Sequence, residues 1–296
     1  MAIPFIRDFE PRYGEAVRLS PRVRRVVADN PGPFTFYGTG VYIIGAGEAV
    51  TVIDPGPDTP NHREALWRAL EGRRVDAVLL THHHLDHTPL ARPLAREHNC
   101  PVYGMSVRDS SDFETDILLD EGGDTDFLPD VEVADCDALP GGLRALHTPG
   151  HTSNHLCFAL PAEDALFTGD HIMGWSTTVV VPPDGSMSDY MASLERVIAG
   201  GFSTLYPTHG APIAEPDAFL SAYRAHRFAR EAKVVAALEA LGGGSVSDLV
   251  ASVYADTDTA LWPAASQSLL AHLIWLQNKG EARREGKVWR LASAQS

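Results

Sequence analysis

Cysteine and positive charge are both scarce in this 296-residue sequence. Its three cysteines, Cys100, Cys136 and Cys157, are scattered along the chain. They therefore provide neither the even number of a disulfide framework nor the paired spacing of a cysteine zinc site. The 24 Lys and Arg residues face 39 Asp and Glu, which gives a formal net charge of -15. This balance excludes a broadly basic, nucleic-acid-binding surface as the dominant feature.

Long hydrophobic runs are absent as well, because no stretch of about 18 apolar residues occurs. The N-terminal MAIPFIRDFEPRYGE has acidic residues and prolines where a signal peptide would have an apolar stretch. We therefore expect a soluble, cytoplasmic protein that does not associate with membranes. With 44% hydrophobic and 21% charged residues, the chain suits one large domain, or a medium domain and a small one, each with its own core.

Strand and helix signals alternate along most of the chain. The apolar runs 41–45 and 49–54 flank the short turn AGE and predict a hairpin. Residues 61–72 follow, with helical spacing and a terminal Gly, and then 75–81, an unbroken apolar run typical of a strand buried on both faces. This order predicts an α/β fold. Further strand-like runs are PVYGM, LRALHT, HLCFAL and DALFTG, and further helical segments are 187–200 and 216–241.

The C-terminal quarter has a different organisation and charge. From residue 222 onward the expected order is helix, turn, helix, third helix and a short basic strand pair with a Gly at its tip, which is the order of a winged helix. Residues 222–296 hold 9 Lys and Arg against 7 Asp and Glu, net +2, and residues 1–221 hold 15 against 32, net -17. We therefore predict a catalytic domain at 1–221 and a winged-helix-like domain at 222–296.

Four of the 13 histidines fall within the segment Thr81–His87. The segment leaves the predicted strand 75–81, so it lies at a strand's carboxyl end, where open α/β sheets place ligand sites. In extended backbone His82 and His84 point to one side and His83 faces away, and a following turn lets Asp86 and His87 face a second, nearby point. Imidazole and carboxylate without thiolate form a ligand set for Zn²⁺, with Fe or Mn as alternative occupants.

Three further candidate ligands also follow strand-like runs. His151 comes after the tight turn Pro149-Gly150, Asp170 ends DALFTGD, and His209 ends TLYPTHG. A histidine-rich segment can also be an idle, solvated loop. Such a loop needs neither an acid in a fixed place nor a strand before each polar residue, so the pattern favours a metal site.

His-x-His-x-Asp-His at 82–87, with His151 in TPGHT, Asp170 in TGD and His209 in PTHG, resembles the metallo-β-lactamase-fold hydrolase superfamily, which includes glyoxalase II. Asp54 in VIDPG matches an early acidic residue near the site in that superfamily. The whole chain, with NPGPFTFYGTG near its start and VYADTDTALWPAA in its tail, is similar to the beta-lactamase-like protein 2 branch. These motifs are specific for the superfamily and only weakly specific for substrate.

The resemblance implies a four-layer αβ/βα sandwich with a two-metal site between the sheets and a C-terminal winged-helix-like domain. By the family's pattern, His82, His84 and His151 bind one metal, Asp86, His87 and His209 bind the other, and Asp170 bridges both. Iron-binding flavodiiron relatives have a Glu in the cluster, and this chain has none there, which favours two Zn²⁺. Mononuclear persulfide dioxygenases lack a complete second ligand set. Its presence here, as Asp86, His87 and His209, favours hydrolysis over oxygen chemistry.

The expected nucleophile is a metal-bridging hydroxide, since zinc lowers the pKa of bound water from 15.7 to about 7. We assign Asp86 the catalytic role of orienting this hydroxide and carrying its proton. Asp54, Thr81 and Thr208 are expected to hydrogen-bond the ligands, although for the two threonines capping a turn is an equally good explanation.

Three functions are consistent with the sequence. The first is hydrolysis of an ester, thioester, lactone or amide of a small molecule, which the acidic catalytic part favours because it repels polyanions. The second is cleavage of single-stranded RNA, for which the predicted wing offers four basic residues, Arg283, Arg284, Lys287 and Arg290. The third is a nucleic-acid-binding regulator with a structural metal, which seven candidate ligands disfavour because a structural zinc needs four. The sequence indicates no particular oligomeric state.

Overall fold

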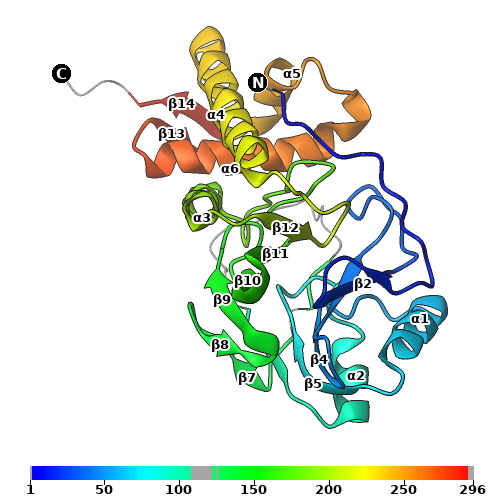
Figure 1. Cartoon of the computed structure of the whole chain (residues 1–296). Helices are drawn as coiled ribbons and strands as arrows, with labels where there is room; N and C mark the ends of the chain where they lie inside the picture. Colours follow the sequence, from blue (N-terminus) through cyan, green and yellow to red (C-terminus); the bar gives the residue numbers. More distant parts are fainter. Residues whose placement is uncertain (1, 108–121, 125, 293–296) are drawn as a thin grey trace.

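The computed structural model describes residues 2–107, 122–124 and 126–292, which form two large sheets, a strand pair and surrounding helices (Figure 1). The first sheet has seven strands, in the order β1 (Val17–Arg18), β2 (Val23–Val27), β3 (Gly40–Ile44), β4 (Ala49–Ile53), β5 (Arg74–Leu79), β6 (Val102–Gly104) and β7 (Val131–Glu132). Strands β1 to β4 pair antiparallel, which confirms the predicted β3–β4 hairpin. Strands β4 to β7 pair parallel, with helices α1 (Pro60–Leu70) and α2 (Ala91–His98) as crossovers.

The second sheet has five strands, in the order β12 (Thr204–Pro207), β11 (Ala165–Gly169), β10 (Leu156–Leu160), β9 (Leu143–His147) and β8 (Ala138–Leu139). Its neighbours from β8 to β11 pair antiparallel, with the short 3₁₀ turn η1 (Pro140–Gly142) between β8 and β9 and η2 (Pro161–Glu163) between β10 and β11. Strands β11 and β12 are parallel, and helix α3 (Met187–Gly200) connects them.

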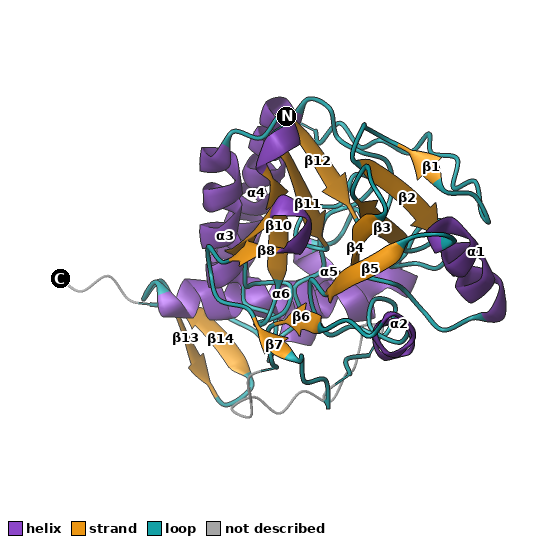
Figure 2. Ribbon diagram, turned by 60° about the horizontal axis from the view of Figure 1, so that its bottom comes forward, coloured by secondary structure: helices purple, strands orange, loops and turns teal. Residues whose placement is uncertain are grey.

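Three apolar clusters separate four layers. Tyr42 and Leu79 of the first sheet pack against Phe158 and Phe167 of the second. The outer face of the first sheet packs on α1 and α2, and the outer face of the second packs on α3 and α4 (Pro216–Leu241). Figure 2 shows α1 and α2 on one side of the sheets and α3 and α4 on the other. The predicted α/β four-layer sandwich is confirmed.

The C-terminal part has the predicted winged-helix order. Its elements after α4 are α5 (Val246–Val253), η3 (Thr259–Leu261), α6 (Trp262–Asn278) and the antiparallel pair β13 (Ala282–Glu285) and β14 (Val288–Leu291). Val234, Leu249, Leu269 and Trp289 belong to its own apolar core. Although α4 runs for 26 residues, no described helix is both long and apolar enough to cross a membrane.

Helix α4 belongs to both parts of the molecule. The boundary predicted at 221/222 falls inside it, and the helix continues there without interruption. Phe219 and Tyr223 in its first half pack in the cluster beneath the second sheet, and Val234 and Leu238 in its second half pack in the C-terminal core. Trp275 of α6 also reaches the cluster beneath the second sheet. The two parts therefore share one helix and adjoining cores.

Candidate metal centre

The candidate ligands lie at the carboxyl ends of strands from both large sheets. The segment His82–His87 follows β5 of the first sheet, and His151, Asp170 and His209 follow β9, β11 and β12 of the second. Carboxyl ends of parallel strands meet at one edge of a sheet. The site therefore forms where corresponding edges of the two sheets face each other.

Glycines shape two of the turns that present these ligands. Gly150, before His151, has a φ of +141°, and a Cβ there would lie 2.3 Å from the Cα of Tyr190. Gly169, before Asp170, has a φ of +50°, and a Cβ there would lie 2.6 Å from the Nε2 of His155. Both positions therefore favour glycine, because a Cβ would lie too close to a neighbouring atom and the positive φ disfavours other residues.

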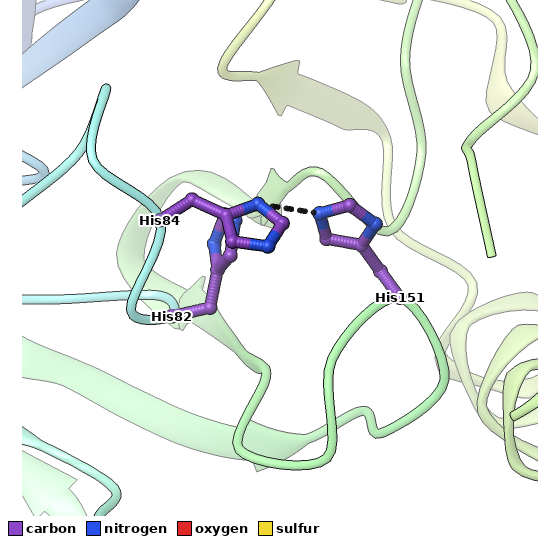
Figure 3. A group of neighbouring side chains, drawn as sticks. All are labelled: His82, His84 and His151. Carbon is purple, nitrogen blue, oxygen red and sulfur yellow. Dashed lines mark hydrogen bonds between the residues drawn. The ribbon is translucent and has the colours of Figure 1, made fainter. Parts of the chain in front are cut away.

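His82, His84 and His151 form the first group, and Figure 3 shows their rings turned toward one another. The Nδ1 of His84 and the Nε2 of His151 are 3.2 Å apart. The ring of His82 lies 4.5 Å from that of His84 and 4.9 Å from that of His151, centroid to centroid. Each residue offers one nitrogen to a common point, so the group has the geometry to hold one metal ion.

Asp86, His87 and His209 form the second group. The Oδ2 of Asp86 lies 3.2 Å from the Nε2 of His87 and 3.4 Å from the Nε2 of His209. Asp170 lies between the groups: its carboxylate oxygens are 3.7 Å from His87 Nε2, 3.3 Å from His209 Nε2 and 3.8 Å from His151 Nε2. The structure thus brings all seven predicted ligands together, with Asp170 in contact with both groups.

Four of the imidazoles are held by hydrogen bonds at Nδ1. The contacts run from His82 Nδ1 to Thr81 Oγ1 (2.9 Å), from His87 Nδ1 to Asp54 Oδ2 (3.0 Å), from His151 Nδ1 to the Val179 carbonyl (2.7 Å) and from His209 Nδ1 to the Gly38 carbonyl (3.2 Å). Donation from Nδ1 leaves the Nε2 lone pair of each ring free to bind a metal.

Asp54 connects several of these supports. It follows β4 in the left-handed conformation, with φ +47°. One of its oxygens accepts from the Thr81 backbone N–H (2.8 Å), and the other accepts from the Thr81 hydroxyl (2.7 Å) and from His87. Because the Thr81 hydroxyl donates to Asp54, it accepts from His82. Thr208 is buried next to His209, and its backbone N–H donates to the Gly169 carbonyl.

Donor atoms at the centre are suited to a cation. The Nε2 atoms of His82, His87 and His209 and the Oδ1 of Asp170 are buried and have no hydrogen-bond partner among the described residues. Buried polar atoms without partners are costly. Since these atoms belong to the ligand types that Zn²⁺, Fe and Mn accept, the residues fit a metal centre.

The histidine pKa values shift in opposite directions in the two groups. Burial, followed by repulsion from neighbouring imidazoles, lowers the pKa of His82 and His84 well below the ordinary value of histidine. Both rings are therefore neutral at pH 7, and a neutral imidazole is the form that binds a metal.

Carboxylates have the opposite effect on the second group. Burial alone lowers the pKa of His87, but Asp86, Asp54 and Asp170 together raise it well above the ordinary value. Burial is likewise outweighed at His209, where Asp170 and Asp86 raise the pKa to about 9. These carboxylates therefore favour the protonated form of both rings when no metal is bound, so loading of the second group is expected to release protons.

Several supporting residues were not predicted from the sequence. The Thr39 hydroxyl donates to Asp86 Oδ2 over 2.8 Å. Buried His155 accepts from the Asp170 backbone N–H through Nε2, at 3.1 Å. The Gly38 and Val179 carbonyls hold His209 and His151, and backbone contacts of this kind leave no residue-type signal. His83 does face away, and its Nδ1 lies 3.0 Å from Asn154 Oδ1.

We expect Asp54→Asn to weaken metal binding at the Asp86/His87/His209 group by about 10- to 100-fold, the usual cost of losing a residue that holds a ligand. The amide keeps the shape of the carboxylate but removes the charge that faces His87 and one of its acceptor oxygens. Titration of the metal-free protein with zinc against a competing chelator measures the change. Asp58→Asn, an exposed position in the same loop, is the matched control, and equal affinities in the two variants would contradict the role of Asp54.

The profile of the metallo-beta-lactamase superfamily matches residues 35–209, which is more than half of the chain and includes every candidate ligand. The chain belongs to the metallo-beta-lactamase superfamily. A second profile, that of the beta-lactamase associated winged helix domain, matches residues 245–289. As a member of this superfamily with thioesterases among its relatives, the chain is a hydrolase.

Relatives of this superfamily member share most of its length. The atrochrysone carboxyl ACP thioesterase dmxR1 of Cryptosporiopsis sp. is 32% identical over 83% of this chain and 76% of its own. The beta-lactamase-like protein 2 homolog of Drosophila melanogaster is 30% identical over 90% of this chain and 91% of its own, which supports the predicted branch. The crystal structure of a beta-lactamase domain protein from Burkholderia ambifaria has the same fold, with a TM-score of 0.78, 24% identity and coverage of 98% and 97%.

Proposed function

We propose that this chain is a dinuclear zinc hydrolase that cleaves an ester, thioester, lactone or amide bond of a small molecule, with a thioester as the first candidate. The observation that supports it best is the pair of three-residue groups that share contact with Asp170. One ion in each group accounts for the buried donor atoms without hydrogen-bond partners. Imidazole and carboxylate donors without thiolate are a ligand set that zinc accepts. Since the flavodiiron relatives that bind iron have a Glu in this cluster and this chain has none, we place zinc ahead of iron.

Two bound ions would supply a nucleophile at neutral pH and polarise the substrate carbonyl. The chain's own residues fix where this happens. Asp86 faces the centre between His87 and His209, and the Thr39 hydroxyl holds one of its oxygens at 2.8 Å. Its carboxylate is thus placed to orient the attacking water and to take up its proton.

A thioester is supported by the relatives and by charge. Two of the relatives, one of them from Cryptosporiopsis, are named atrochrysone carboxyl ACP thioesterases. Cleavage of RNA needs a surface that attracts phosphates. In the wing, Arg283 and Arg290 both face Glu285, at 3.5 and 3.8 Å, which reduces the basic character of this hairpin. We therefore place a small acyl substrate ahead of single-stranded RNA.

Metal analysis followed by a substrate panel tests the proposal. We expect two zinc ions per chain and turnover of one or more thioesters, with turnover at least about 100-fold slower in Asp86→Ala. Esters, a lactone, an amide and labelled single-stranded RNA complete the panel. RNA cleavage that is lost in Asp86→Ala, without turnover of any acyl substrate, would establish the ribonuclease instead. A single bound ion in the active protein would contradict the dinuclear centre.

A further inference from the structure

The loop between Asp170 and α3, residues 171–185, supports one of the candidate ligands. The carbonyl of Val179 in this loop accepts from the Nδ1 of His151 at 2.7 Å. The ring orientation of His151, and hence the direction of its Nε2, depends on where this carbonyl lies. What holds the loop therefore also holds the ligand.

Two side chains of α4 hold the loop. The Tyr223 hydroxyl donates to the Ser176 carbonyl (2.6 Å) and accepts from the Thr178 N–H (3.0 Å). Arg227, one turn further along the same face of the helix, donates from Nη2 to the Thr178 carbonyl (2.6 Å). Tyr223 and Arg227 are both buried. Together they fix both backbone groups of Thr178, the residue immediately before Val179.

Arg227 also contacts a second support of the same ligand. Its guanidinium lies over the ring of Tyr190, 4.6 Å from the centroid. The backbone of Tyr190 packs so closely on Gly150 that a Cβ there would lie 2.3 Å from the Cα of Tyr190, and Gly150 is the residue before His151. A buried cation is costly unless its contacts compensate for lost water. The Thr178 carbonyl and the face of the Tyr190 ring provide such contacts. Thr178 precedes Val179 and Tyr190 packs on Gly150, so both contacts adjoin the groups that hold His151.

We infer that Arg227 is a positioning residue that sets the affinity of the His82/His84/His151 group for its metal, through Thr178 and the Val179 carbonyl. The inference rests on the proposed metal centre. It also gives the helix that leads into the winged-helix part a role in the catalytic site, since Arg227 lies beyond the predicted boundary at 221/222. The winged-helix part is then more than an attached binding module.

Titration of metal-free variants with zinc against a competing chelator tests this inference. We expect Arg227→Met to bind one of the two ions at least about tenfold more weakly, which is the lower end of the range for losing a residue that holds a ligand. Arg227→Lys keeps a donor for the Thr178 carbonyl and is expected to recover most of the affinity. Arg224→Met removes a partly exposed arginine of the same helix, paired with Glu195, and is expected to match the wild type.

A double-mutant comparison separates positioning from general loss of stability. If Arg227 acts through His151, then Arg227→Met has no further effect on zinc affinity in a His151→Ala background. An equal loss in both backgrounds overturns the inference, and so does wild-type affinity for both ions in folded Arg227→Met. Should Arg227→Met fail to fold, Arg227→Gln takes its place in the same two backgrounds, and the same outcomes decide. A wild-type chain that takes up no metal contradicts the proposed function itself.

Discussion

Asp170→Asn is expected to lower kcat/KM by at least about 1000-fold, or about 4 kcal/mol of transition-state stabilisation, since a catalytic metal contributes several kcal/mol. Asp170 is the residue whose carboxylate lies within 4 Å of His151, His87 and His209. An amide at this place has one acceptor oxygen and no charge to balance two divalent ions. We therefore also expect fewer than two zinc ions per chain by metal analysis.

The matched control for Asp170→Asn is Asp189→Asn, which replaces an exposed acid in the first turn of α3. Its expected cost is limited to a small loss of helix stability. Comparable rates in the two variants, both shown to be folded, would mean that Asp170 does not connect the two groups.

A chain that ends at residue 221 is expected not to fold stably. The deletion removes Tyr223, Ala271 and Trp275 from the cluster beneath the second sheet, together with the Arg227 bond to Thr178. Loss of a large buried aromatic side chain costs about 3–5 kcal/mol, and a whole domain is stabilised by only about 5–15 kcal/mol. The part of the cluster that these residues cover would also be exposed to water.

Circular dichroism and thermal unfolding of the purified fragment measure this loss. A chain that ends at residue 292 keeps every described contact and is the control. A cooperative thermal transition in the 1–221 fragment, near that of the control, would show that the catalytic part is independent of the rest.

Much of the fold could be predicted because the local signals agree with the final layers. The hairpin at 41–54, the buried strand at 75–81 and the helix at 187–200 each form where periodicity and turn residues place them. The candidate metal ligands could also be predicted, since His151, Asp170 and His209 each follow a strand-like run. Strand ends gather at one sheet edge, so their order along the chain already indicates one site.

What the sequence did not reveal depends on contacts between distant segments. Arg227 has the appearance of any arginine on a helix, and its bond to Thr178 spans 49 residues. Val179 contributes only its backbone carbonyl, a group that every residue type has, so its side chain gives no signal in the sequence. The charge difference between the two parts is a surface property, and it carries no information about a helix that contributes to two cores.

The origin of the ligands in both sheets also bears on biosynthesis. A nascent chain that has emerged only as far as β7 contains Asp86 and His87 but lacks His151, Asp170 and His209. Complete cation capture must therefore wait until the second half of the sandwich has left the ribosome and docked. If the proposed two-ion centre forms, its full occupancy would therefore require that both sheets have folded and packed together, and an intermediate that lacks the second sheet could not hold both ions.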